Sequence, residues 1–316
     1  MKYFTYVSKQ LFIYFIILII TIFGSYIFLY SFFNKNYETN LLNQFFSFIK
    51  NIFSQSLKPS SIFLNNSGFE SVNFLVYKYW EISIIILGIS FGISLFLGIS
   101  IGLYLGFKVN SLAENVVSLI IFIFAAVPTF IFAPILLSVA EINDIPILYV
   151  ADSGPLFWFL SIILPILLLS IIPISYIATN IKTSVILVSK KDFITQLKSN
   201  GMSNLNVFFK GYLNHLIANL ITELIPIYLL MNSFLIILEK MFQIPGQSML
   251  ILLIFETKDF NVLVFFVSIQ IIIFLLFSFI STTIFNYLTL NYLKNNKLIV
   301  FNLQLKFKTM FQRRRI

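Results

Sequence analysis

The sequence contains no cysteine, a single histidine and few charged side chains, which make up 10% of its 316 residues. Without cysteine the chain can form neither disulfides nor thiolate metal sites. His215 alone cannot build a His-Glu-x-x-His zinc site or a Ser-His-Asp relay. There is no Gly-x-x-x-x-Gly-Lys-Ser/Thr segment, and so no P-loop to hold nucleotide phosphates. We therefore predict that the protein is not an enzyme and uses neither a cofactor nor a bound metal.

Hydrophobic residues are abundant instead: they form 59% of the chain, include 39 phenylalanines and give a mean hydropathy of +0.95. A soluble domain carries about 25% charged residues, so lipid is expected to surround most of this chain. A membrane-spanning helix needs about 20 apolar residues. Six stretches are long enough, roughly 10–33, 81–107, 116–140, 156–179, 214–238 and 262–290. The first is too long for a signal-peptide core and lacks a cleavage site of small residues, so we expect it to be retained.

Positive charge predicts the orientation of these six spans, because cytoplasmic loops are enriched in Lys and Arg. An even number of spans places both termini on one side. If that side is the cytoplasm, 15 of the 21 Lys and Arg residues lie inside and 6 lie outside. We therefore predict cytoplasmic termini and a cytoplasmic loop, residues 182–213, between the fourth and fifth spans. The basic end at 311–316 then lies beside the membrane, where anionic lipid is a better partner than nucleic acid.

These features define an all-α polytopic bundle in three parts. Residues 1–80 hold the first span and an external segment, residues 81–292 form a five-helix core, and residues 293–316 form a basic cytoplasmic tail. Within the external segment, apolar residues recur at helical spacing from Leu41 to Phe53. The pattern predicts an amphipathic helix that either lies in the membrane interface or packs on the outer rim of the bundle.

Glycine and proline mark particular helices of the predicted core. The second span carries glycines that are mostly four residues apart, namely Gly88, Gly92, Gly98, Gly102 and Gly106. This spacing lets another helix approach closely, either from the same chain or from a second subunit. The third and fourth spans carry Pro128, Pro134, Pro165 and Pro173. Proline should kink or interrupt these helices, and broken backbone at membrane depth is tolerated where it is packed or lines a cavity.

Glu223 is the one ionisable residue deep inside a predicted span. An intramembrane protease of the aspartyl type would need a pair of such acids. Burying an unpaired acid is costly, so such residues usually face the bundle interior or a water-filled route. Glu223, together with Pro128, is thus a candidate for the translocation pathway. The alternative is a structural acid that is satisfied by neighbours such as Thr222 or Asn219, or that is protonated.

The segment from Ser189 to Ser203 is polar and basic, although apolar stretches flank it. Ser189 and Asp192 have the spacing of a capping box, and Gly201 is a natural helix stop. The helix between them places Phe193, Ile194 and Leu197 on one face. Ser203 can cap a second helix that leads into the fifth span. The segment is either a helix–turn–helix with a functional role or an ordinary structured loop.

Several motifs of the chain resemble bacterial ABC importer permeases, most closely the B-type subunit of the dipeptide/oligopeptide/nickel family. That family's cytoplasmic EAA loop reads Asp-Tyr-Val and then Lys-Gly-Leu-Ser, and here the residues are Asp192-Phe193-Ile194 and Asn200-Gly201-Met202-Ser203. Three further landmarks keep the family's order: Pro128-Thr129-Phe130, the Glu-x-x-Phe-x-x-Pro-Gly pattern of Glu239 to Gly246, and Lys258-Asp259-Phe260. Thr195-Gln196-Leu197 stands where the loop's name-giving Glu-Ala-Ala would be.

The resemblance implies a permease subunit of an ATP-driven importer in the bacterial cell membrane, working by alternating access. Its partners would be a second permease in a heterodimer, two ABC ATPase subunits, an external substrate-binding lipoprotein and an oligopeptide substrate. The loop would be a coupling helix that contacts an ATPase through Asp192, Phe193, Ile194, Leu197, Lys198, Gly201 and Ser203. In this coupling helix, Phe193, Ile194 and Leu197 would supply the apolar contact with the ATPase. Lys198 would supply a polar contact, and Gly201 would form the turn. Alternatives are a permease for nickel or another small solute, a membrane scaffold or insertase, and a secondary transporter.

Overall fold

The computed structural model describes residues 2–33, 41–54, 56–59, 71–127, 129–143, 146, 148–150 and 154–295. Within these residues the chain is helical and contains no strand. The elements are α1 (Lys2–Phe33), α2 (Leu41–Phe53), α4 (Val72–Phe107), α5 (Leu112–Ala126), α6 (Thr129–Ile142), α7 (Pro155–Ser189), α8 (Asp192–Ser199), α9 (Asn204–Val207), the π-helical turn η1 (Phe208–Tyr212), α10 (Leu213–Met241), α11 (Gln247–Thr257) and α12 (Phe260–Asn295). Pro128 and nearly all of the predicted tail, 293–316, lie outside the described residues.

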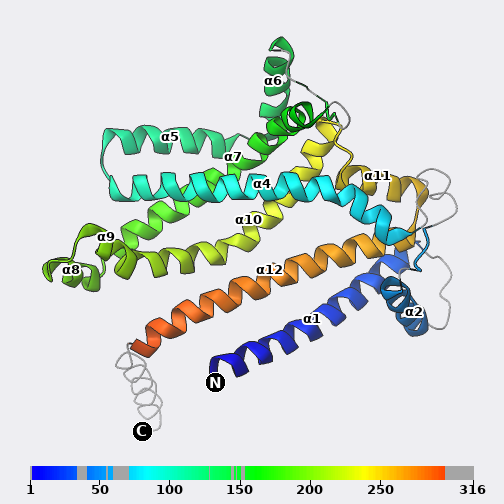
Figure 1. Ribbon diagram of the computed structural model, residues 1–316, viewed down its shortest axis with the longest axis horizontal. Coiled ribbons are helices and arrows are strands. Elements are labelled where there is room, and N and C mark those ends of the chain that lie inside the picture. The colour runs from blue at the N-terminus through cyan, green and yellow to red at the C-terminus, as the bar shows by residue number, and fades with distance from the viewer. Residues whose placement is uncertain are drawn as a thin grey trace, which may run out of the picture.

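Five helical stretches of the described chain are long and apolar enough to cross a membrane: α1, α4, α7, the path from α9 to α10, and α12. The predicted third span instead forms α5 and α6, which meet at an angle of 100°. α5 contacts α7 more extensively than α4, and α6, which points upward in Figure 1, contacts α7 and α10. The described residues therefore provide five candidate spans, or up to six if this bent pair forms one span. The helix is interrupted between Ala126 and Thr129, the interval of the sequence that contains Pro128.

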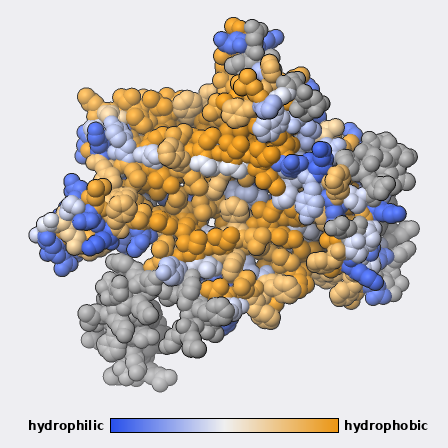
Figure 2. All heavy atoms as spheres, viewed as in Figure 1, coloured by the Kyte–Doolittle hydropathy of each residue, from blue (hydrophilic) through white to orange (hydrophobic). Residues whose placement is uncertain are grey.

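The helices run between two ends of the molecule (Figure 1). The α4–α5 turn, α8, the start of α1 and the end of α12 lie toward one end, and α2 and α11 lie at the other. Figure 2 shows apolar residues over the middle, with hydrophilic residues gathered mainly toward the ends. An apolar belt between two polar ends is the surface that a bilayer requires, because hydrocarbon cannot hydrogen-bond exposed polar groups.

α4 and α7 share the most extensive helix contact of the fold. In the half nearer the α4–α5 turn it is formed by Gly98, Gly102 and Gly106, where an added Cβ would lie 2.6–2.7 Å from atoms of Ile177, Ala178, Ile181 or Val185 on α7. Only glycine leaves room for so close an approach. For these three glycines the contact lies within the chain.

The other half of the same α4–α7 contact, nearer the start of both helices, is polar. Ser90 donates across the contact to the carbonyl of Ile166 at 3.2 Å. Ser94 and Ser170 donate mainly within their own helices, to the carbonyls of Ser90 and Ile166 at 2.6 and 2.7 Å, and lie within 3.4 and 3.3 Å of the carbonyls of Ser170 and Ser90 across the contact. Each hydroxyl thereby joins two helices without leaving a buried donor unpaired. Gly88 and Gly92, by contrast, have no atom within 4 Å of an added Cβ. At these two positions a contact with another subunit stays a prediction.

α7 continues unbroken through Pro165 and Pro173, although both were expected to kink or interrupt it. Both rings are buried in the bundle. Packing on both sides holds a helix together where proline removes one backbone hydrogen bond, since neighbouring helices restrain its path. The fourth span is therefore not interrupted at either proline, and a kink there stays a prediction.

An aromatic cluster at the α2 end joins α1, α2 and α12. The ring of Tyr26 on α1 contacts Phe45 and Phe48 of α2 and Phe260 of α12, with centroid separations of 5.3–5.6 Å. Such edge and tilted contacts add to the burial of apolar area. α2 therefore packs on the bundle. Of the two positions predicted for the amphipathic helix, this is the one on the outer rim of the bundle. Its opposite side leaves Phe46 and two other large apolar residues exposed, namely Leu42 and Phe53.

Candidate functional site

α8 begins later than the sequence indicated. α7 runs on to Ser189, whose hydroxyl donates to the carbonyl of Ile186 at 2.8 Å. The N-cap of α8 is Lys191, which makes no side-chain capping bond. The predicted capping box of Ser189 and Asp192 is therefore wrong, because Ser189 still belongs to the preceding helix and its hydroxyl is used there.

α8 ends as predicted, just before Gly201, which follows the C-cap Asn200 and has a φ of +73°. The Gly201 N–H donates to the carbonyl of Lys198 at 3.0 Å, and the Met202 N–H to that of Leu197 at 3.4 Å. These two bonds form a Schellman motif, which requires a left-handed residue after the helix. No atom lies within 4 Å of an added Cβ at Gly201. Glycine is thus required here by the backbone conformation and not by packing.

The second helix of the loop is joined directly to a membrane span. The Ser203 hydroxyl accepts from the Asn206 N–H at 3.4 Å and so caps α9, as predicted. From Asn204 the path continues through η1 into α10, giving 38 residues of continuous helix up to Met241. A π-helical turn inside such a path often marks a functional position. α8 is therefore attached, through one turn, to the end of a span.

The apolar face of α8 packs on its own chain. Ile194 is 1% exposed. An added Cβ on Gly211 of η1 would lie 2.5 Å from Ile194 Cδ1 and 3.2 Å from Leu197 Cδ1, and the ring of Phe193 lies 5.4 Å from that of His215. Phe193 and Leu197 are half-buried, and the exposed side chains of this segment are polar: Lys190, Lys191, Asp192, Thr195, Gln196, Lys198, Ser199 and Asn200.

Glu223 has a partner that the sequence did not suggest. The Tyr176 hydroxyl, on α7, donates to Glu223 Oε2 at 2.5 Å. The expected neighbours are engaged elsewhere: Thr222 donates to the carbonyl of Asn219, and the Asn219 amide donates to Ser184. Glu223 is only half-buried, and Tyr176 is 43% exposed. This acid is therefore paired but still open on one side.

The Tyr176–Glu223 pair belongs to a row of polar groups along the contact between α7 and α10. We call this row the polar α7–α10 face; it consists of Tyr176, Thr179, Thr183, Asn219, Thr222 and Glu223. All are exposed except the half-buried Glu223. The exposed residues of α1 between Leu11 and Ile20 are all apolar, for example Phe12 and Phe15. The two surfaces suit different surroundings, since hydrocarbon tolerates the second but not the first.

A second acid of α10, Glu239, is fully buried, although the sequence placed it among the external charges. Its Oε1 accepts from the Ser83 hydroxyl of α4 at 2.5 Å, and its Oε2 from the Ser248 N–H at 2.8 Å. Ser83 in turn accepts from the Gln247 N–H at 2.8 Å. We call these four residues the Glu239 network. It satisfies the N-terminus of α11 and joins α4, α10 and α11.

Gly246 explains why this acid lies inside a Glu-x-x-Phe-x-x-Pro-Gly pattern. An added Cβ there would lie 2.5 Å from the carboxyl carbon of Glu239 and 2.6 Å from Ser83 Oγ. The glycine lets the backbone reach the carboxylate at the start of α11. The pattern itself, an acid followed by Pro-Gly and then an apolar run, was the signal in the sequence that could have identified the network.

One ion pair lies within the part of the chain that the structure describes. Lys182 of α7 contacts Glu114 of α5 and also donates to Ser118 at 3.0 Å. Glu114 caps α5 together with Ser111, since its N–H donates to the Ser111 hydroxyl while its carboxylate accepts from the Asn110 N–H. The pair fixes α5 against α7.

An all-helical chain with several membrane-length apolar helices is a multi-pass membrane protein. Residues 98–291, more than half of the chain, match the family of binding-protein-dependent transport system inner membrane components. The chain belongs to this family, whose members are the non-catalytic membrane permeases of ABC importers. The matched residues contain α8, the polar α7–α10 face and Glu239. The comparison with curated proteins found no match.

Proposed function

We propose that this chain is the B-type permease of an importer for oligopeptides, with the termini and α8 in the cytoplasm of a bacterial cell. It pairs with a second permease, two ABC ATPases and an external substrate-binding lipoprotein. The observation that carries the proposal is α8, a short polar helix at one end of the bundle that is joined to a span. The oligopeptide substrate rests on the motifs around Asp192, Gly201 and Glu239, which resemble those of peptide permeases.

α8 transmits movement of an ATPase to the membrane. Its exposed side chains, among them Asp192, Gln196 and Lys198, form the contact with the ATPase. Of the three apolar residues, Ile194 is buried against η1 and holds α8 in place. Phe193 and Leu197 also pack on η1 and α10 but are only half-buried, so they add apolar contact to the ATPase. A displacement of α8 therefore moves α10 with it, since packed helices shift as units.

The polar α7–α10 face lines the pathway or its contact with the second permease. Its hydroxyls, amide and carboxylate would be costly in hydrocarbon, whereas a pathway supplies water or polar partners. Glu223 lies at its centre as a polar group that a passing peptide can contact. Pro128, outside the described residues, stays a candidate for the same pathway.

Substitution of Gly201 tests the coupling role. Gly201→Val places a β-branched residue at φ +73°, a conformation that costs an ordinary residue about 1–2 kcal/mol. We expect normal membrane insertion but loss of peptide uptake and of ATPase stimulation by the binding protein. Gly201→Asn is the matched control, because asparagine adopts the left-handed region more readily. Normal uptake by the valine variant in a reconstituted complex would contradict the proposal.

Co-purification tests the class of function. A permease brings down two ATPases and a sister permease from solubilised membranes. Recovery of ribosomes or nascent chains instead would establish the insertase alternative. Uptake of nickel but not of a tripeptide by the same complex would replace the peptide with a metal chelate as the substrate.

A further inference from the structure

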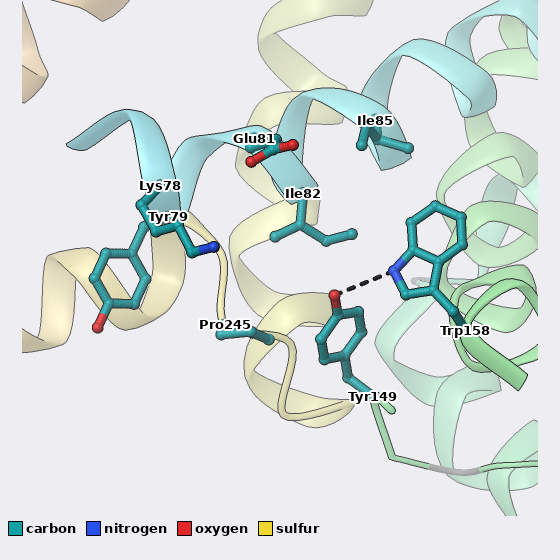
Figure 3. A pocket seen from close by; sticks show the side chains of 8 residues that line it. All are labelled: Lys78, Tyr79, Glu81, Ile82, Ile85, Tyr149, Trp158 and Pro245. Atoms are coloured by element: carbon teal, nitrogen blue, oxygen red, sulfur yellow. Dashed lines mark hydrogen bonds between the residues drawn. The ribbon is translucent and has the colours of Figure 1, made fainter. Parts of the chain in front are cut away.

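A cavity of about 440 Å³ lies at the end of the molecule opposite α8 (Figure 3). It is open on one side and is lined by the first turns of α4, the start of α7 with the segment before it, and the turn before α11. Its lining residues are Lys78, Tyr79, Glu81, Ile82, Ile85, Tyr149, Trp158 and Pro245. This volume falls within the roughly 300–1,000 Å³ of small-molecule sites.

One wall of the cavity is aromatic and held in place. The Trp158 indole N–H donates to the Tyr149 hydroxyl at 3.1 Å, and Figure 3 shows the two side chains directed toward each other. The Tyr149 N–H donates to the carbonyl of Phe242 at 3.3 Å. Pro245 follows Phe242 in the turn and precedes Gln247 and Ser248. Because these two residues belong to the Glu239 network, the network holds the end of the turn in place. Because these side chains are already held in place, binding a ligand would cost little further side-chain entropy on this wall.

The other side of the cavity carries two opposite charges. Lys78 and Glu81 are three residues apart on α4 and so project from neighbouring positions of one helix face. Both are exposed, and neither forms an ion pair within the described residues. In Figure 3 their charged ends lie on the side of the view away from the Trp158 indole. The site thus combines a cation, an anion and an aromatic surface.

We infer that this cavity binds the short zwitterionic peptide that the permease transports. Glu81 accepts from the peptide ammonium, Lys78 donates to its carboxylate, and its side chains pack on Trp158 and Tyr149. A sphere of the cavity's volume is about 9 Å across, the length of two to three extended residues at about 3.3–3.6 Å each. The site therefore suits dipeptides and tripeptides. This inference rests on the proposed function and names its substrate more narrowly.

Tryptophan fluorescence can test the site directly. The chain has two tryptophans, so Trp80→Phe leaves Trp158 as the only one. The full chain, reconstituted in nanodiscs, is titrated with trialanine. We expect a saturable change in Trp158 emission, and about tenfold weaker binding for each terminus that is blocked, which corresponds to about 1.4 kcal/mol.

Charge substitutions in this background assign each terminus. Glu81→Gln should weaken binding of trialanine about tenfold but leave N-acetyl-trialanine, which has no ammonium, almost unaffected. Lys78→Gln should behave in the same way toward trialanine amide, which has no carboxylate. Glu256→Gln, an exposed acid on α11, is the matched control and should change nothing. Equal affinity for free and blocked peptides, or no titration at all, would overturn the inference.

Uptake separates this inference from the proposed function. If the reconstituted complex imports trialanine but Trp158 does not respond, the site is wrong and the peptide permease stands. If Trp158 responds but the complex imports no peptide, the cavity binds peptides and the proposed transport function is wrong.

Discussion

The two acids of α10 have opposite surroundings, although each follows an apolar run in the sequence. Glu239 is fully buried and accepts from one hydroxyl and one backbone N–H, on two other helices. Glu223 accepts from a single phenol and remains open on one side. A closed set of partners is typical of a structural acid. An open side leaves capacity for water, substrate or another subunit, which is typical of a functional one.

The comparison also reverses the expectation from the sequence about which of the two acids is the more deeply buried. Glu223 stood out because its neighbours are apolar, whereas Glu239 is followed by Lys240 and looked like an external charge. Burial depends on what a residue meets in space, and Glu239 meets Ser83 and Gly246. The family's Glu-x-x-Phe-x-x-Pro-Gly pattern therefore describes a connection between helices.

The largest expected effect comes from truncating the buried acid. Glu239→Ala leaves the Ser248 N–H and the Ser83 hydroxyl without this acceptor, and each unpaired buried group costs about 1–3 kcal/mol. We expect a clearly lower thermal midpoint in detergent. Glu223→Ala should change that midpoint little but lower peptide uptake. Equal loss of stability in the two variants would remove the distinction between them.

An intermediate effect is expected from filling the space beside the same acid. Gly246→Ala brings a methyl group to 2.5 Å from the Glu239 carboxyl carbon, and overpacking of this kind costs about 1–3 kcal/mol. Gly88→Ala is the matched control, since no atom lies within 4 Å of its added Cβ. Thermal unfolding of both purified variants measures the difference. A Gly246→Ala protein as stable as the Gly88→Ala protein would show that α11 shifts freely away from Glu239.

The smallest effect on folding should come from Tyr176→Phe, which removes the hydroxyl bound to Glu223. A single hydrogen bond contributes about 0.5–1.5 kcal/mol, and the half-open site lets water replace the phenol. We expect a small change in the thermal midpoint and a measurable change in the uptake rate. A stability loss as large as that of Glu239→Ala would mean that Glu223 is a structural acid.

Local features of the candidate site were predictable, and features that join distant segments were not. The stop at Gly201 and the cap at Ser203 follow from residues within one helical turn, and both are present. The capping box at Ser189 failed because α7 extends further than its local signals indicated. Tyr176 could not be assigned to Glu223 because 47 positions separate them. The glycines of α4 looked alike in sequence, yet only those from Gly98 to Gly106 are covered by α7.

An all-helical membrane protein with a polar helix–turn–helix segment ahead of α10 could be predicted from the sequence alone. These properties depend on the transfer of apolar runs into lipid and on backbone preferences, which nearby residues dictate. The tertiary structure decided which acid is enclosed, which face of α8 is free and where a cavity opens beside Trp158. Those depend on which surfaces meet when helices pack, and close packing is set by side chains far apart in the chain.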